Sequence, residues 1–185
     1  VVAGSYRRGA QESGDIDILC TTPTYNVSVF VNIVNVLETA RYLKTSLQSS
    51  TYNKYIGISK MAGCPARRID IKYTDKKYWP FALLQWTGDL QFTLDLRNHA
   101  IACGYSLSDQ SLKVGHMDGV PVNHNFQTEE DVLNYLGVNY VEPQNRRANA
   151  VKDNLMDPPP ATAVPKSPPK AKAPAKSPGS AAKKK

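Results

Sequence analysis

The sequence predicts an α+β fold, in which a small mixed β-sheet with flanking helices precedes a mostly helical second part and a disordered basic tail. Three observations predict this order. Two short segments, DIDIL and ARRIDIKY, alternate isoleucine with charged residues, as half-buried strands do. Longer segments between residues 79 and 137 repeat apolar residues at helical spacing, and residues 158–185 are mostly proline, alanine, lysine and serine. A chain of 185 residues can bury one core of ordinary size.

The first motif is the segment GSYRRGAQESGDIDIL, which begins at Gly4. A short apolar start followed by Gly-Ser predicts a strand that leads into a helix, whose first N–H groups attract an anion. Arg7 and Arg8 come next, and guanidinium groups bind phosphate oxygens at two points. The beginning of the chain is therefore predicted to bind a phosphate group.

The end of the same motif carries two acids. Asp15 and Asp17 alternate with Ile16 and Ile18, so the isoleucines face a core and both carboxylates share the other face of the strand. Paired carboxylates suit Mg²⁺ or Mn²⁺. Together with the phosphate-binding turn, the pair predicts phosphoryl or nucleotidyl transfer from a metal-bound triphosphate. The alternative is a surface strand with two solvated acids.

A third acid lies in the segment ARRIDIKY, which follows the strand-like KYIGISKM and the turn-prone AGCP. Asp70 alternates with Ile69 and Ile71, so it stands beside the first two acids if the strands are neighbours. Arg68 shares its face and is predicted to orient or neutralise Asp70 when no metal is bound. The alternative is an ordinary surface acid paired with Arg68.

Three segments are predicted to form helices. NVSVFVNIVNVLETARYL is ambiguous because its β-branched residues favour a strand, but its length and its LETARYL end favour a helix. YWPFALLQWTGDLQFTLDLRNHAIACGY is predicted to form two helices that meet at Thr87-Gly88, the second over residues 89–103. TEEDVLNYLG begins with a capping Thr128 and ends at Gly137, and a short β element is expected near residues 106–113.

Charge is unevenly distributed along the chain. Of 23 basic and 16 acidic side chains, seven lysines and no acid lie in residues 158–185, so residues 1–157 carry 16 of each. The tail cannot bury enough apolar surface to offset its ordering entropy and is predicted to be extended or disordered. Either it attracts the phosphate backbone of nucleic acids, or it is a solubilising segment or an address for an import receptor. The predicted boundaries are 1–75, 76–150 and 151–185.

Several classes of protein are not supported by the sequence. Three scattered cysteines without a CxxC pair, together with His99, His116 and His124, give neither a disulfide framework nor a zinc site. The sequence contains no signal peptide and no apolar run of membrane-spanning length, so we expect an intracellular protein without a membrane partner. Val1 falls within a predicted strand and no start methionine precedes it, so the chain is expected to be part of a longer protein.

Five motifs carry a family resemblance, in the order GSYRRGAQESGDIDIL, YIGISK, ARRIDI, WTGDLQFTLDLRNHA and EEDVLNYLGVNYVEPQNR. With this order and spacing, residues 1–147 resemble the family X DNA polymerases, the group of DNA polymerase beta and its terminal-transferase relatives. The resemblance implies a nucleotidyltransferase-type palm over residues 1–75. It further implies a thumb-and-fingers subdomain for nucleotide selection over residues 76–150.

The resemblance also implies roles for individual residues. Asp15, Asp17 and Asp70 match the three palm carboxylates that hold two Mg²⁺ ions, or Mn²⁺ in their place, and Asp70 matches the acceptor of the primer hydroxyl proton. Four residues match positions that bind the triphosphate of the incoming nucleotide: Ser5, Arg8, Ser13 and Gly14. Trp86 and Gly88 match the segment that lines its sugar. Three residues are assigned to the DNA side: Arg68, Thr93 and Arg97.

The implied activity is that of a DNA-directed polymerase that adds dNMP to a primer 3′-hydroxyl with release of pyrophosphate, in nuclear repair gap filling. The implied partners are dNTP and gapped or primer-template DNA, and the protein is expected to act as a monomer. The lyase and helix-hairpin-helix regions that normally precede the palm are expected to be absent from this chain.

Three alternatives to this activity stay open. Gln85-Trp86 is more similar to the terminal-transferase branch, so template-independent synthesis is one alternative. The others are a nucleotidyltransferase acting on RNA or a small molecule, and a non-catalytic DNA-tethering module.

Overall fold

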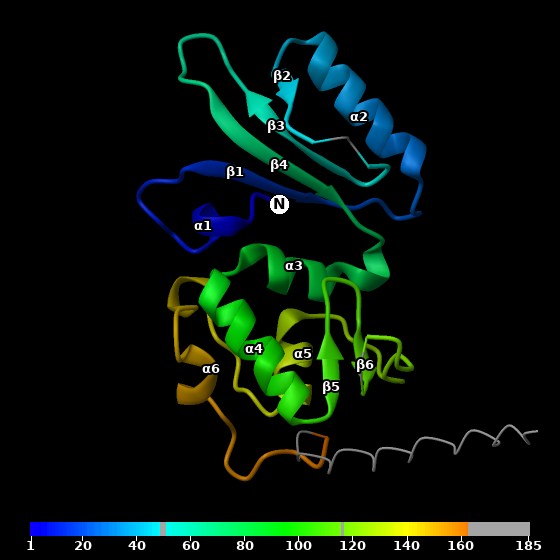
Figure 1. The fold of residues 1–185 in the computed structure, drawn as a ribbon, viewed down its shortest axis with the longest axis vertical. Coiled ribbons are helices and arrows are strands. Elements are labelled where there is room, and N and C mark those ends of the chain that lie inside the picture. The colour runs from blue at the N-terminus through cyan, green and yellow to red at the C-terminus, as the bar shows by residue number, and fades with distance from the viewer. Residues whose placement is uncertain (49–50, 116, 163–185) are drawn as a thin grey trace, which may run out of the picture.

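Four strands form one mixed sheet in the computed structural model, which describes residues 1–48, 51–115 and 117–162 (Figure 1). In sheet order the strands are β1 (Asp15–Cys20), β4 (Arg67–Tyr73), β3 (Lys54–Ser59) and β2 (Leu43–Ser46). β1 runs parallel to β4, whereas β3 is antiparallel to both of its neighbours. The three strands predicted from the sequence are confirmed. The sequence does not predict β2, because this edge strand is short and only Leu43 in it is buried.

The first residues of the chain cover the outer edge of β1. Val2 forms a β-bridge with Ile18, and the N–H of Ala3 donates to the carbonyl oxygen of Asp17 at 2.8 Å. α1 (Gly4–Arg7) follows this bridge directly. The predicted sequence of short strand, Gly-Ser turn and helix is therefore confirmed, with a helix of a single turn.

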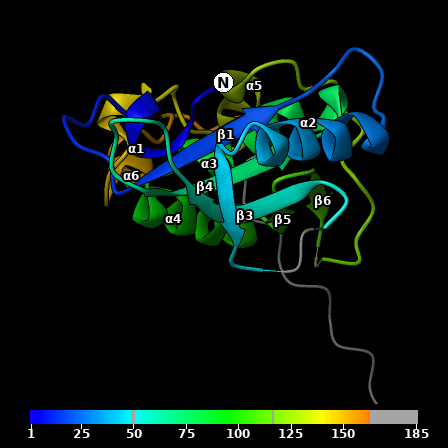
Figure 2. The same cartoon turned by 90° about the horizontal axis from the view of Figure 1, so that it is seen from above.

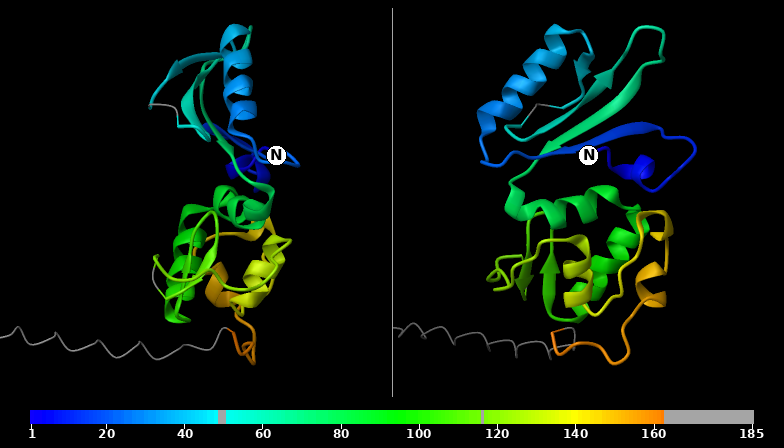
Figure 3. Two further views of the ribbon diagram at one scale, coloured as in Figure 1. Left: turned by 90° about the vertical axis from the view of Figure 1, so that its right-hand side faces the viewer. Right: turned by 180° about the vertical axis from the view of Figure 1, so that it is seen from behind.

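α2 (Val27–Thr39) covers one face of the sheet (Figure 3). The side chain of Asn26 caps this helix by accepting from the N–H of Ser28. Phe30 and Val34 are buried against the sheet. The same core contains Leu43, Tyr55, Ile69, Ile71 and Tyr73. Because the isoleucines of β4 face α2, the charged residues that alternate with them face the other side.

The second half of the chain forms a mostly helical subdomain with its own core, and from above the sheet overlies it (Figure 2). Its elements are η1 (Lys76–Tyr78), α3 (Trp79–Thr87), α4 (Leu90–Ala102), β5 (Tyr105–Leu107), β6 (Leu112–Val114), α5 (Glu129–Tyr135), η2 (Pro143–Asn145) and α6 (Ala150–Asp153). The two helices that meet at Thr87-Gly88, the helix after Thr128 and the short β element are confirmed. α3 contacts both α1 and β1 and so joins this subdomain to the sheet.

The folded chain continues past the predicted boundary at residue 151. Val151 is buried in α6, and Leu155 forms a β-bridge with Val138. The hydroxyl of Thr162 donates to the carbonyl oxygen of Tyr135 at 2.8 Å. The boundary must therefore lie later, because these residues complete the helical core, which the lysine-rich composition does not reveal. Residues 163–185, on which the prediction of a disordered tail rests, lie outside the described residues.

Within the described residues, Cys20, Cys64 and Cys103 form no disulfide. None of the helices in this part of the chain combines the length and hydrophobicity needed to cross a bilayer. His116 lies outside the described residues.

We expect replacement of Thr128 by alanine to lower the free energy of unfolding by about 1 kcal/mol. The hydroxyl of Thr128 accepts from the N–H of Asp131 at 3.1 Å, and the Asp131 carboxylate accepts from the N–H of Thr128 at 2.9 Å. Removing the hydroxyl leaves one helix N–H without its partner. Urea denaturation followed by tryptophan fluorescence measures the loss. Thr39→Ala at the exposed end of α2 is the control, and an equal loss in both variants would contradict the capping role.

Candidate active site

The three predicted acids lie on neighbouring strands and on one face of the sheet. β1 and β4 pair in parallel, with Asp17 opposite Asp70 and Asp15 opposite Arg68. Residues paired in this way point to the same face, and the intervening isoleucines point to the other. The strand register therefore brings together acids that are far apart in the sequence. We call this surface, which carries Asp15, Asp17, Arg68 and Asp70, the acid-bearing face.

Arg68 binds Asp70 through two hydrogen bonds. Its Nε donates to Oδ1 at 3.0 Å and its Nη2 donates to Oδ2 at 2.8 Å. The same Nη2 lies 3.9 Å from Oδ2 of Asp15. The side chain of Asp70 is 9% exposed and that of Arg68 is 51% exposed, so the guanidinium covers the carboxylate on its solvent side. The hydrogen bonds to Asp70 raise the pKa of Arg68. The predicted pairing of Arg68 with Asp70 is confirmed.

Asp17 lies in a tight space between Gly4 and the other acids. Burial, followed by the charges of Asp15 and Asp70, raises the pKa of Asp17 from 3.8 to about 6. Gly4 has a φ of +55°, and a Cβ atom built on it would lie 1.9 Å from Oδ2 of Asp17. The glycine of the Gly-Ser turn is therefore required by the close approach of this carboxylate as well as by the backbone conformation.

Ser5, Ser13 and Gly14 lie beside the acids. The hydroxyl groups of Ser5 and Ser13 share a hydrogen bond of 2.5 Å, and Oγ of Ser13 donates to the carbonyl oxygen of Asp15 at 2.7 Å. Ser13 and Gly14 are exposed. Within the described residues, nothing lies within 4 Å of the position that a Cβ on Gly14 would take. Three of the residues assigned to the triphosphate thus border the acid-bearing face, with Ser13 and Gly14 exposed and Ser5 half-buried.

Arg8 lies at the junction between the sheet and the helical subdomain. Its Nη1 donates to the carbonyl oxygen of Thr87 at 2.6 Å, and a Cβ on Gly88 would lie 3.2 Å from the same nitrogen. In this structure Arg8 therefore binds the last turn of α3, next to the position assigned to the nucleotide sugar. Trp86 belongs to the same turn, and Nζ of Lys54 lies 5.7 Å from the centroid of its ring. Arg8, Trp86 and Gly88 are thus gathered at the end of α3.

A buried ionic network joins α1 to α5, and sequence reasoning missed it. Oε1 of Glu129 accepts from Arg7 at 2.9 Å and from Arg146 at 2.7 Å, and Oε2 accepts from Arg7 at 2.6 Å. Arg7 also donates to the hydroxyl of Thr87 at 2.6 Å. Burial favours the neutral acid, but the hydrogen bonds from Arg7 and Arg146 outweigh it, so the pKa of Glu129 lies below its usual value. Arg7, which the sequence suggests as a phosphate ligand, therefore has a structural partner.

Thr93 and Arg97 lie one and two turns along α4 from its capping residue, Asp89. Arg97 is exposed and Thr93 is half-buried, and their spacing puts them on one face of the helix. In the part of the chain that the structure describes, neither side chain forms a hydrogen bond or ion pair with the acid-bearing strands. Their assignment to the DNA side stays a prediction.

The donor chemistry of the acid-bearing face fits a divalent metal ion. Three carboxylates on one face supply the oxygen ligands that Mg²⁺ and Mn²⁺ prefer, and the charges of Asp15 and Asp70 add to the effect of burial in raising the pKa of Asp17. Within the described ranges, however, no three acidic, histidine or cysteine side chains form a ready metal site. Both oxygens of Asp70 are bound by Arg68. A metal ion held by all three acids would therefore either share the Asp70 carboxylate with Arg68 or displace the guanidinium from it.

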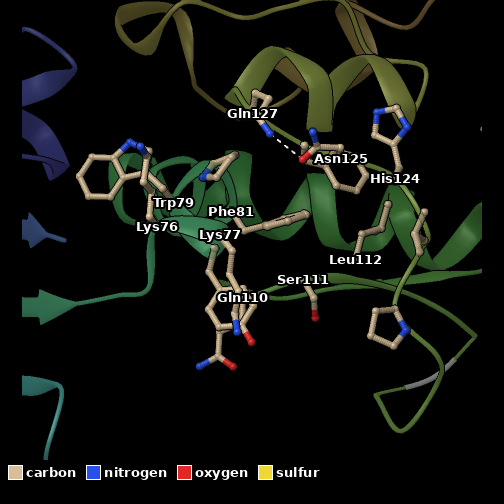
Figure 4. Close-up of a pocket in the computed structure, with 15 residues that line it drawn as sticks. Lys76, Lys77, Trp79, Phe81, Gln110, Ser111, Leu112, His124, Asn125 and Gln127 are labelled. Atoms are coloured by element: carbon tan, nitrogen blue, oxygen red, sulfur yellow. Dashed lines mark hydrogen bonds between the residues drawn. The ribbon is translucent and has the colours of Figure 1, made fainter. Parts of the chain in front are cut away.

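A separate cavity of about 520 Å³ lies in the helical subdomain (Figure 4). Its walls come from η1, the start of α3, the turn between β5 and β6, and residues 121–127. Lys77, Phe81 and His124 are among the side chains that line it (Figure 4). None of the three acids lines this cavity, so it is not the site that the sequence predicts.

The chain matches the models of two known protein domains. Residues 1–76 match the DNA polymerase beta palm, and residues 82–147 match the DNA polymerase beta thumb. The first range contains the acid-bearing sheet, and the second contains most of the helical subdomain.

Relatives of known identity agree with these matches. The chain is 34% identical to DNA polymerase lambda from Rattus norvegicus, over 79% of this chain and 28% of that protein. It is 29% identical to DNA polymerase lambda from Arabidopsis thaliana, over 79% of this chain and 31% of that protein. Identity to DNA nucleotidylexotransferase from Gallus gallus is 24%, over 80% of this chain and 35% of that protein. The chain thus spans about a third of the length of these relatives.

A solved structure supports the same conclusion about the fold. The crystal structure of polymerase beta from Leishmania infantum, a ternary P/T complex, matches with a TM-score of 0.69 and 29% sequence identity. The match covers 80% of this chain and 66% of that chain.

A mixed sheet that carries three acids on one face, followed by a helical thumb, defines the class of proteins with a nucleotidyltransferase-type palm. The matches to the DNA polymerase beta palm and thumb narrow this class to one family. The chain belongs to the family X DNA polymerases, and the resemblance seen in the sequence motifs is confirmed.

We expect the carboxyl group of Asp17 to titrate with a pKa of about 6 in the absence of divalent metal. Because this pKa lies above that of the unfolded chain, ionisation of Asp17 opposes folding, and this opposition disappears as the pH falls through 6 toward 4. Carbon NMR of labelled aspartate measures the titration. Asp15→Asn removes a neighbouring negative charge and should lower the pKa of Asp17, whereas Asp75→Asn should not. An unchanged pKa in Asp15→Asn would refute the coupling between the acids.

Replacement of Glu129 by glutamine is expected to lower the free energy of unfolding by about 3 kcal/mol, because it leaves buried Arg146 without an opposite charge. The pKa of Glu129 is lowered by folding, so its stabilising contribution is present above the unfolded pKa and is lost as the pH falls through the folded pKa. Glu129→Gln should therefore show a shallower loss of stability in acid than the parent chain. Denaturation at several pH values tests both effects. Glu130→Gln, at an exposed neighbour in α5, is the control.

Proposed function

We propose that this chain is the palm and thumb of a DNA-directed DNA polymerase that adds dNMP to a primer 3′-hydroxyl. The observation that carries the proposal is the parallel register that sets Asp17 opposite Asp70, with Asp15 on the same face. The matches to the beta-type palm and thumb support it. The relatives are DNA polymerases lambda and a DNA nucleotidylexotransferase, which favours DNA over RNA or a small molecule as the acceptor.

Asp15, Asp17 and Asp70 are assigned to two Mg²⁺ ions, with Mn²⁺ as a substitute. When bound, such ions supply charge stabilisation for the attacking and leaving oxygens. The contribution of the chain is to keep three carboxylates on one face of the sheet. The pKa of about 6 for Asp17 leaves this group mostly ionised near neutral pH even before a cation binds.

The proposed reaction forms one bond and breaks another at the α-phosphorus of the dNTP. The primer 3′-oxygen bonds to this phosphorus, and the bond to the oxygen that leaves with pyrophosphate breaks. The hydroxyl proton passes to Asp70, directly or through a water molecule. Since both oxygens of Asp70 accept from Arg68, this role requires Arg68 to move away first.

The residues around the acids are assigned to the two substrates. Ser5, Ser13 and Gly14 bind the triphosphate, and Arg8 joins them by giving up or sharing its hydrogen bond to the carbonyl oxygen of Thr87. Trp86 and Gly88 line the sugar. Three residues serve the DNA side: Arg68, Thr93 and Arg97.

We further propose that the cellular role is gap filling in DNA repair, by a monomer in the nucleus. The relationship to DNA polymerase lambda supports the polymerase part of this role. The seven lysines of residues 158–185 add an attraction to DNA that does not depend on base sequence, and they also suit an import receptor.

The proposal predicts primer extension on gapped DNA that requires Mg²⁺ and the acids. We expect Asp17→Asn and Asp70→Asn each to lower the extension rate at least about a hundredfold. Each variant removes a negatively charged ligand of the proposed metal ions, which stabilise the attacking and leaving oxygens. A labelled primer in a one-nucleotide gap, resolved by gel electrophoresis, measures the rate. Asp75→Asn replaces a half-buried acid just beyond β4, at a position where asparagine can still cap η1, and is the matched control.

The same assay separates the competing functions. Parental rates in Asp17→Asn and Asp70→Asn would refute the polymerase proposal, and a chain that binds DNA without extending it would be a tethering module. Extension of a single-stranded primer without a template would favour template-independent synthesis, to which Gln85-Trp86 and the relationship to DNA nucleotidylexotransferase point. A preference for ribonucleotides would indicate a different nucleotidyltransferase.

A further inference from the structure

A second charged surface lies at the end of the sheet that points away from the helical subdomain (Figure 1). It is a groove of about 610 Å³ between the end of α2, the start of β2 and the residues that follow β3. Three cations line it: Arg41, Lys44 and Lys60. We call it the basic groove. Its other lining residues are Ala40, Tyr42, Met61 and Ala62, so no acid lines it.

The three cations have no acidic partner in the ion pairs formed within residues 1–48, 51–115 and 117–162. The acid closest in sequence, Glu38, contributes its backbone carbonyl to the N–H of Arg41 and does not line the groove. Three like charges around one hollow repel one another and are stabilised by an anion that bridges them.

The backbone at Arg41 gives an independent reason to look for a ligand. α2 ends in a Schellman motif, in which the N–H of Arg41 donates to the carbonyl of Glu38 and the N–H of Tyr42 donates to that of Leu37. Arg41 takes the left-handed position of this motif, with a φ of 56°, where glycine is usual. A bulky residue in this conformation is strained, and such strain persists most often at functional positions. An arginine at this position therefore costs backbone strain that a glycine would not.

The other two cations are also presented by irregular backbone. The register between β2 and β3 shifts between Leu43 and Thr45, which makes Lys44 the extra residue of a β-bulge. Bulges of this kind redirect a side chain and are common beside active sites. Lys60 follows β3, and its N–H continues the pairing by donating to the carbonyl oxygen of Tyr42 at 2.9 Å.

The basic groove lies within reach of the acid-bearing face. Ile56 and Ile58 of β3 pair with Asp70 and Arg68, so even-numbered positions of β3 share the face of the acids, and Lys60 continues this alternation. From the spacing of residues and strands, Lys60 lies about 14 Å from Asp70. One strand of DNA advances about 3.4 Å per nucleotide along the helix axis, so a duplex whose axis runs parallel to β3 covers this distance in about four nucleotides.

We propose that the basic groove binds the phosphate backbone of the primer strand about four nucleotides from its 3′ end. This inference rests on the proposed polymerase function, in which that end lies at Asp70. Arg41 contributes a two-point hydrogen-bonding group, and Lys44 and Lys60 contribute point charges. The contact is to phosphate and not to base edges, so it strengthens binding of every sequence alike.

The test measures DNA affinity of the full chain by fluorescence anisotropy with a labelled primer-template between about 50 and 200 mM KCl. Arg41→Gly should weaken binding about threefold to tenfold at the lower salt concentration. It should also reduce the slope of log Kd against log salt by about one, as expected for loss of one phosphate contact. Lys44→Ala and Lys60→Ala should act in the same direction, and Arg41→Lys should retain part of the affinity.

Arg41→Gly also separates binding from folding. Glycine relieves the left-handed strain, so this variant should unfold at the same temperature as the parent chain or at a higher one while it loses DNA affinity. Asn149→Gly is the matched control, because Asn149 has a φ of 66° and carries no charge. The control should keep both the affinity and the salt slope. Unchanged affinity and slope in Arg41→Gly would overturn the proposal.

A modified primer locates the contact. Neutral methylphosphonates at the third to fifth linkages from the primer 3′ end should weaken binding of the parent chain more than they weaken binding of Arg41→Gly, which keeps only the contacts of Lys44 and Lys60. Additive losses would overturn the assignment to these phosphates, as would an Arg41→Gly effect confined to the KM for dNTP.

The experiments distinguish failure of the phosphate contact from failure of the polymerase proposal. If the parent chain extends no primer but Arg41→Gly still lowers affinity and salt slope and the losses remain non-additive, the polymerase proposal fails and the phosphate contact stands. If extension occurs and the affinity of Arg41→Gly is unchanged, the polymerase proposal stands and the phosphate contact fails.

Discussion

The hydrogen bonds from Arg7 to Glu129 join α1, which lies against the sheet, to the helical subdomain, and Arg146 of that subdomain binds the same carboxylate. Arg7 belongs to the same single helical turn as Gly4, whose missing side chain leaves room for the carboxylate of Asp17. The turn therefore contacts an acid of the sheet at one end and α5 at the other. Glu129 is also the first residue of α5, where the helix dipole favours a negative charge. If this network were broken, the turn that encloses Asp17 would lose its anchor.

Local patterns in the sequence predict most of the helices and strands and the positions of the three acids. They do not predict which residues bind each other across the junction between the sheet and the helical subdomain. Alternation with isoleucine placed Asp15, Asp17 and Asp70 on strands, and the Thr128 capping pattern located α5. Arg7 and Arg8 were both expected at a phosphate, yet each binds a group that is distant in sequence, Glu129 for one and the carbonyl oxygen of Thr87 for the other. Such pairings leave no periodic signal, because they arise only once β1 and α3 have packed together. Short elements with one or two buried residues, β2 and α6, were missed because they depend on the core that they complete.

The sheet is electrostatically polarised from one side to the other. Acids lie on β1 and β4, and three cations without an ion pair among the described residues surround the far end of β2 and β3. This distribution of charge favours the approach of a polyanion along the cationic side. The strand order β1-β4-β3-β2 is what separates the two kinds of charge, since it places the acid-bearing strands together and the cationic ends beyond them.

Arg68 gives the acid-bearing face a counter-ion of its own. A guanidinium bound to a nearly buried carboxylate offsets part of the repulsion among three acids, so the chain does not need to capture a cation in order to fold. The same guanidinium would compete with any divalent cation for the oxygens of Asp70, which would weaken the apparent affinity for that cation. One side chain, two positions before Asp70 on the same strand, therefore both neutralises the acids and opposes their binding of a metal ion.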